Sequence, residues 1–188
     1  MPHRNYAVIT STFYCMKRNI LYSVCCLAFS IIIGGAVYEH LNIVPTWAAA
    51  PPVSLSMFQG EYGLKPDLFW KIIHPVNILL LVVTLIFNFK SARRSNIVIV
   101  LTGYILILVV TAIYFVPELL SITTTAFNTN KDSELIRRAS LWETLSLIRL
   151  TLLIVLAITL FMGLTKVVAS THVARRTRTL QTRKTVAG

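Results

Sequence analysis

Acidic residues are scarce in this chain, and their distribution is uneven. Only seven Asp and Glu occur among 188 residues, against 18 Lys and Arg, and all seven lie within residues 39–67 or 118–143. With 55% hydrophobic residues and a mean hydropathy of +0.70, the composition excludes an ordinary soluble domain. A strongly positive net charge, here +11, is also typical of nucleic-acid-binding proteins. We expect no nucleic-acid partner, because the cations flank apolar segments, where membrane orientation explains them.

Paired cysteines and common cofactor motifs are also missing. Cys15, Cys25 and Cys26 form no CxxC motif, which argues against a disulfide framework and against a thiol relay. Adjacent Cys25 and Cys26 are typical of small packing or lipid-facing residues. No P-loop, dinucleotide fingerprint, HExxH or CxxCH motif occurs, so we expect no metal and no cofactor. A haem remains an alternative only if His40 and His74 converge.

Four long apolar segments are present instead. They cover residues 20–38, 69–89, 97–116 and 145–169. Each is close to the roughly 20 residues that cross a hydrocarbon core about 30 Å thick. The short connection at residues 90–96 joins the second and third segments into an antiparallel hairpin. The sequence therefore predicts one all-α domain, an integral membrane four-helix bundle in the lipid bilayer.

The basic residues predict the orientation of this bundle. Most of the Lys and Arg residues lie before the first segment, in the connection at 90–96, or after residue 165. Because cytoplasmic loops are rich in Lys and Arg, we expect both termini to be cytoplasmic and both acidic connections to be outside. The tail at residues 170–188 is predicted to be a basic cytoplasmic segment held near anionic headgroups. We expect the protein in a bacterial inner (plasma) membrane.

The two outer connections differ in composition. Residues 40–68 combine several prolines with apolar and aromatic side chains, which predicts a segment folded over the outer mouth of the bundle. Residues 117–143 are polar and predict a solvent-facing, mobile or partly helical segment. Trp47, Trp70 and Trp142 are all expected near the outer interface, where an aromatic belt is their favoured interpretation.

Polar side chains inside the spans are the candidates for function, because placing them in lipid is costly. On each of three spans they share one helical face. They are Trp70, His74 and Asn77 on the second span, Tyr104, Thr111, Tyr114 and Glu118 on the third, and Trp142, Ser146 and Arg149 on the fourth.

One hypothesis is a polar pocket in the outer half of the bundle. Its catalytic residues would be His74 as a general base or ligand, Arg149 as the group that holds an anionic or enolate oxygen, and Glu118 as the residue that orients either one. Its substrate-binding residues would be Trp70, Asn77, Tyr114 and Trp142. The alternative is structural: Arg149 pairs with Glu118 or Glu39, and His74 bonds a backbone carbonyl, because structural networks also gather polar groups.

Several short motifs follow one another along the spans: Gly34, Gly35 and Pro45, then Phe69-Trp70 and His74-Pro75, then Tyr114-Phe115 and Pro117-Glu118, and finally Trp142 with Arg149. This set of motifs resembles that of a known family, the anthrone-oxygenase-like small four-helix membrane proteins. The resemblance covers about residues 20–169. Characterised members are thought to oxidise polycyclic aromatic anthrones without an obvious cofactor, which implies a base and an oxyanion partner. His74 and Arg149 can fill these two roles here.

Two functional classes stay open. An enzyme would bind a small lipophilic substrate in the outer half of the bundle and deprotonate or oxidise it with His74 as base. A non-enzymatic component would bind a lipid or quinone, or pair with another membrane protein or with copies of itself through the outer loop. The two classes differ in whether His74, Glu118 and Arg149 converge on a cavity or contact one another directly.

Overall fold

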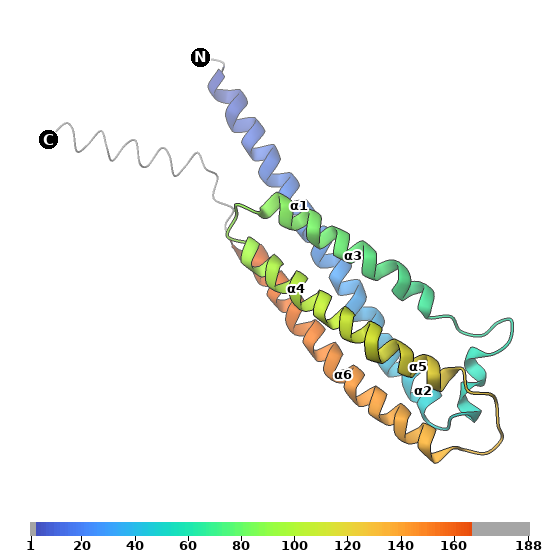
Figure 1. Cartoon of the computed structure of the whole chain (residues 1–188). Helices are drawn as coiled ribbons and strands as arrows, with labels where there is room; N and C mark the ends of the chain where they lie inside the picture. Colours follow the sequence, from blue (N-terminus) through green and yellow to red (C-terminus); the bar gives the residue numbers. More distant parts are fainter. Residues whose placement is uncertain (1–2, 167–188) are drawn as a thin grey trace.

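Four helices of membrane-spanning length pack side by side along the molecule (Figure 1). The computed structural model describes residues 3–166, with side chains from residue 14 onward, and this range contains helices and no strands. The four spans are Tyr14–Ala48, Asp67–Asn88, Arg94–Thr123 and Ser133–Thr165. The prediction of an all-α, four-helix membrane bundle is confirmed.

The first span is longer than its apolar segment predicted. Helix α1 (His3–Tyr38) continues through a π-helical turn (Glu39–Ile43) into α2 (Val44–Ala48). Pro45 lies in the first turn of α2, where a missing amide proton costs least. The wider π-helical turn directly before it relieves the clash between a proline ring and the preceding turn.

The third span also contains a π-helical turn before a proline. Helix α4 (Arg94–Val110) passes through a second π-helical turn (Thr111–Phe115) into α5 (Val116–Thr123). The helix continues past Pro117 to Thr123. Each π-helical turn therefore ends two residues before a proline.

The second and fourth spans are continuous helices. Helix α3 (Asp67–Asn88) contains Pro75 without a break. Helix α6 (Ser133–Met162) begins well before the predicted residue 145, because the Asp132 side chain accepts hydrogen bonds from two backbone amides of its first turn. The outer connection at residues 117–143 is therefore partly helical, as predicted.

The four helices form a closed ring in which α1 and α4 each contact both α3 and α6. The exposed start of α1, the α3–α4 connection and the end of α6 lie at the same end of the bundle (Figure 1). We call this the inner end, because the positive-inside rule assigns it to the cytoplasm. The tail at residues 170–188 lies outside the described residues.

Apolar packing divides into two clusters along the bundle. The inner cluster contains Tyr22, Phe29 and Tyr104, with both Cys25 and Cys26 buried in it as packing residues. Many large apolar side chains elsewhere are exposed along the helices, as expected of surfaces in contact with lipid.

The outer cluster joins the first outer connection to the bundle. Its short 3-10 helix (Val53–Phe58) places Leu55 fully inside, so this connection covers the outer end as predicted. Trp47 and Trp142 meet there edge to face, with ring centroids 5.6 Å apart. The aromatic-belt interpretation is wrong for these two residues, because both rings are buried by protein rather than placed at the lipid interface.

Gly35 allows α1 to approach α3 closely. A Cβ atom at Gly35 would lie 2.7 Å from the Phe69 ring and 3.6 Å from the Trp70 ring, whereas a Cβ atom at Gly34 would meet nothing within 4 Å. We expect Gly35→Leu to reduce the free energy of unfolding by about 1–3 kcal/mol more than Gly34→Leu, because overpacking moves α3 away from α1. Unfolding of both variants in the same bicelles measures the difference. Equal values would contradict this account of the crossing.

Candidate functional site

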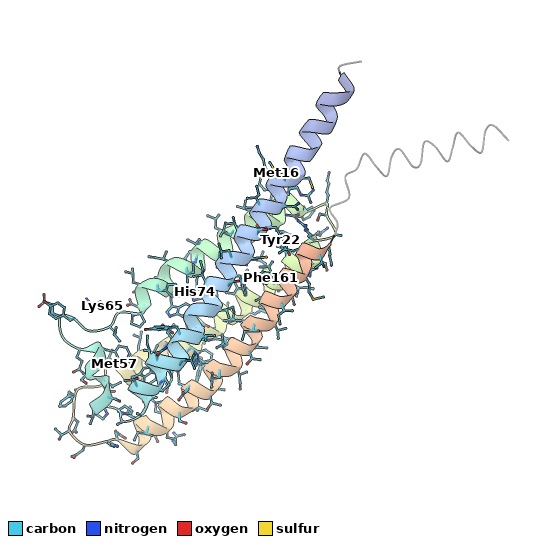
Figure 2. The ribbon with its side chains drawn as sticks, turned by 180° about the vertical axis from the view of Figure 1, so that it is seen from behind. Met16, Tyr22, Met57, Lys65, His74 and Phe161 are labelled. Atoms are coloured by element: carbon cyan, nitrogen blue, oxygen red, sulfur yellow. The ribbon has the colours of Figure 1, made fainter. Side chains whose placement is uncertain are left out.

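Polar side chains from three helices and a π-helical turn meet in the outer half of the bundle. We call this group the outer polar cluster. It consists of Glu39, Trp70, His74 and Tyr104, which are joined by hydrogen bonds and ring stacking, and of Arg149, which lies within electrostatic range of them. Figure 2 shows His74 between Tyr22, toward the inner end, and Met57 in the outer connection. Three members of the predicted site, Trp70, His74 and Arg149, are therefore brought into one group.

His74 is held on two sides. Its Nδ1 lies 2.7 Å from the hydroxyl oxygen of Tyr104, and its ring stacks on Trp70 with centroids 5.2 Å apart and planes inclined by 22°. The expected bond to a backbone carbonyl is therefore replaced by a bond to the hydroxyl of a buried tyrosine. The Nε2 atom has no hydrogen-bond partner among the described residues and is not fully buried. It is free to bond a ligand.

Arg149 lies among neutral groups. Its guanidinium donates to the hydroxyls of Ser146, at 2.9 Å, and Thr111, at 3.3 Å, and stands 4.3 Å above the centre of the Phe115 ring. A guanidinium carries five N–H donors, so several remain available. No carboxylate oxygen of the described residues comes within 4.0 Å of it. The positive charge of Arg149 has no direct ion pair.

Glu39 is the carboxylate that faces this charge. Its Oε1 accepts a hydrogen bond of 2.7 Å from Trp70 Nε1. Glu39 and Arg149 are close enough for their charges to influence each other, but no ion pair within 4.0 Å joins them. Glu39 and Thr111 are also the first residues of the two π-helical turns, a feature that is frequent at functional sites. The cluster thus holds two separated opposite charges.

Glu118 does not belong to this cluster. It forms a bidentate ion pair with Arg138, at 2.7 and 2.9 Å, between α5 and α6 at the outer end. The predicted Glu118–Arg149 ion pair is therefore wrong. Helix α6 begins earlier than its apolar segment suggested, so Arg138 faces Glu118, while Arg149 lies about 16 Å deeper at about 1.5 Å per residue.

The predicted substrate-binding residues are divided between two places. Trp70 is in the cluster, and Asn77 follows His74 by one turn, fully buried with neither amide atom hydrogen-bonded. Trp142 donates to the carbonyl of Phe115, and Tyr114 packs against the Phe115 ring in the outer apolar cluster. Trp142 approaches the Arg149 guanidinium only with its ring, at 6.0 Å.

The pairing of His74 with Tyr104 was missed by the sequence prediction, although Tyr104 was on the polar stripe. The sequence does contain a signal for it. In a hairpin with a short turn, residues equally far from the turn lie at the same depth, and His74 and Tyr104 are nearly equidistant from residues 89–91. Glu39 was considered only as an ion-pair partner, and its bond to Trp70 depends on the π-helical turn.

Metal-binding groups do not gather in the described part of the chain. No set of three or more His, Cys, Asp or Glu side chains is arranged there to hold a metal ion. His40 lies with its Nδ1 2.8 Å from the carbonyl oxygen of Ala36, one turn back on its own helix.

These observations define the chain as an all-helical, four-span membrane protein with a polar cluster in the outer half of its bundle. Comparisons with protein-family models, with curated proteins and with solved structures find no match to this chain. The resemblance to the anthrone-oxygenase-like family stays a prediction.

The position of Glu118 predicts a structural role that can be separated from ligand binding. We expect Glu118→Gln to lower the free energy of unfolding by up to about 1 kcal/mol, because it removes a bidentate ion pair between two helices. Glu134→Gln is the matched control, since its pair with Arg137 is exposed and lies within one helix. Chemical unfolding of both variants gives the comparison. A larger effect of Glu134→Gln would contradict this assignment.

Proposed function

We propose that this protein binds a small lipophilic molecule that carries an acidic or anionic oxygen, such as an enol, a phenol or a carboxylic acid. The binding site is the outer polar cluster. Arg149 holds the oxygen of the ligand, and Nε2 of His74 exchanges a proton with it. The lipophilic part of the molecule lies among the apolar side chains of the bundle.

The observation that carries this proposal is the lack of an ion pair at Arg149. A charged side chain inside a membrane is costly unless it is paired. The described partners of Arg149 are two hydroxyls and an aromatic ring, none of which carries a negative charge. An oxyanion of a ligand supplies the missing charge and can accept two parallel hydrogen bonds from a guanidinium.

Glu39 partly compensates the positive charge of Arg149 without forming an ion pair with it. Its charge attracts Arg149 through space, while Trp70 Nε1 holds one of its oxygens. A direct ion pair would occupy the guanidinium and favour a purely structural role. The separation of the two side chains supports ligand binding instead.

Catalysis is a second candidate, and the environment of His74 favours it. Tyr104 and Trp70 hold the imidazole in place, and Nε2 remains open, which is the arrangement required of a general base. With a substrate whose acidic C–H adjoins a carbonyl group, Nε2 takes the proton and Arg149 stabilises the resulting enolate oxygen. The resemblance to anthrone-oxygenase-like proteins implies this class of substrate. A non-enzymatic lipid- or quinone-binding subunit would use the same groups for binding alone.

Binding is tested by native mass spectrometry of the protein purified in a mild detergent. We expect the parent to retain a small molecule and Arg149→Gln to bind it at least about tenfold more weakly, because hydrogen bonds to charged groups contribute about 1.5–3 kcal/mol. Arg138→Gln is the matched control, since it removes an arginine from the same helix but outside the cluster. A parent without ligand, or equal retention by Arg149→Gln, would refute the proposal.

Catalysis is tested separately by deuterium exchange at the acidic carbon of an added anthrone. We expect His74→Gln to slow this exchange by about 10²–10⁴-fold while binding is retained, because general-base catalysis contributes about that factor. Unchanged exchange in His74→Gln, with binding intact, would leave the protein as a binding component without this activity.

A further inference from the structure

Three basic residues from three segments of the chain lie at the inner end of the bundle. We call this group the inner cation cluster, and it consists of Arg18 on α1, Arg93 before α4, and Lys166 after α6. Arg93 is its centre: Nη1 donates to the Asn19 side chain at 2.7 Å, and Nε donates to the Lys166 carbonyl at 3.3 Å. Arg93 thus contacts the residue after Arg18 and the backbone of Lys166, which brings the three residues together without a bond between their charged groups.

Arg93 is nearly enclosed by protein. Only 5% of its surface is exposed, and its guanidinium stands 5.1 Å from the centre of the Tyr22 ring. A further donor reaches the carbonyl of Leu164 at 3.4 Å. The acceptors are carbonyl oxygens near the C-terminal end of α6, where the helix dipole favours a positive charge. Arg93 therefore joins three segments of the chain, and its charge remains inside the protein.

Arg18 and Lys166 lie on either side of this centre and are partly exposed. Arg18 donates to the side-chain oxygen of Asn88 at 3.1 Å, and its Nε atom is buried without a hydrogen-bond partner. Lys166 donates to the side-chain oxygen of Asn96 at 2.6 Å. In the described part of the chain, every hydrogen-bond acceptor of the cluster is a neutral oxygen.

The described residues offer no side-chain carboxylate at this end. The sequence contains no Asp or Glu before Glu39, between Asp67 and Glu118, or after Glu143. The acidic residues lie in the outer parts of the spans or in the outer connections. Cations that are partly removed from water are stabilised by a negative counter-charge. An anionic ligand can supply that charge at the inner end.

We propose that the inner cation cluster binds the phosphate group of an anionic phospholipid. The cluster lies at the inner ends of the spans, where lipid headgroups are found. Arg18 and Lys166, which are both partly exposed, contact the phosphate oxygens. Arg93 is a positioning residue that does not contact the phosphate. Its buried positive charge adds to the attraction between the cluster and the phosphate. The site is separate from the outer polar cluster and does not depend on the function proposed for it.

An orientation signal alone does not account for this arrangement. Orientation needs only cations near the ends of the spans. Lys17 and Lys90 meet this need, and both are exposed. Arg18, Arg93 and Lys166 are instead each held by hydrogen bonds to neutral oxygens of neighbouring segments, so we expect a discrete lipid site rather than a diffuse attraction.

The site is tested by titrating the protein in a neutral detergent with phosphatidylglycerol or with phosphatidylcholine, and counting bound lipids by native mass spectrometry. We expect one phosphatidylglycerol to bind more tightly than phosphatidylcholine. Arg18→Gln and Lys166→Gln should each weaken this binding about fivefold, since each cation contributes about 1 kcal/mol near an anionic surface. Arg18→Lys and Lys166→Arg should retain most of it.

Lys90→Gln is the matched control, because it removes one exposed charge at the same end but outside the cluster. We expect it to weaken the binding less than twofold. Equal affinity for the two lipids, or an equal loss in Lys90→Gln and in both cluster variants, would overturn the proposal. So would tighter binding of inorganic phosphate than of phosphatidylglycerol, or retention of nucleic acid at this end in place of lipid.

Discussion

Hydrocarbon offers no hydrogen bonds to a polypeptide backbone, and this constraint shapes the helices of the bundle. The first and third spans both contain a proline near the outer end, yet neither span breaks there. A π-helical turn precedes each proline and lets the helix continue. The same turns begin at Glu39 and Thr111, one a member of the outer polar cluster and the other a partner of Arg149. The residues that begin both turns thus belong to the outer polar cluster or contact a member of it.

Charged side chains have different kinds of partner at the two ends of the bundle. At the outer end, Glu118 and Arg138 form a direct ion pair, and deeper in the bundle Glu39 faces Arg149 without an ion pair. At the inner end, the described hydrogen bonds of Arg18, Arg93 and Lys166 all go to neutral oxygens. A charge that is paired within the chain supports the fold. The two ligand proposals rest on charges for which the described residues provide no ion pair, Arg149 in the outer half and Arg18 and Lys166 at the inner end.

His74 and Arg149 reach the outer polar cluster from different helices, so their relation depends on how the bundle closes. Gly35 brings α1 close to α3, which allows Glu39 to accept a hydrogen bond from Trp70. Trp70 in turn stacks on His74. One small residue thus supports the position of the imidazole, and packing and chemistry are linked through a short chain of contacts.

The sequence by itself determined the number of spans, their antiparallel order along the bundle, and the shared face of Trp70 and His74. These follow from apolar length, charge distribution and helical periodicity, which are properties of local sequence. The same local information placed Arg149 inside the bundle, but it could not select a partner for it.

Only the tertiary structure decided those partners. Helix α6 begins at Ser133 rather than near residue 145, so Arg138 meets Glu118, and Arg149 is left among hydroxyls and an aromatic ring. Trp47 and Trp142 became buried because the first outer connection folds onto the bundle. Which side chains become partners depends on how far neighbouring helices are shifted along the bundle axis and how they are rotated about their own axes. An apolar sequence pattern encodes neither quantity, because contact with lipid is similar at every depth of the hydrocarbon core.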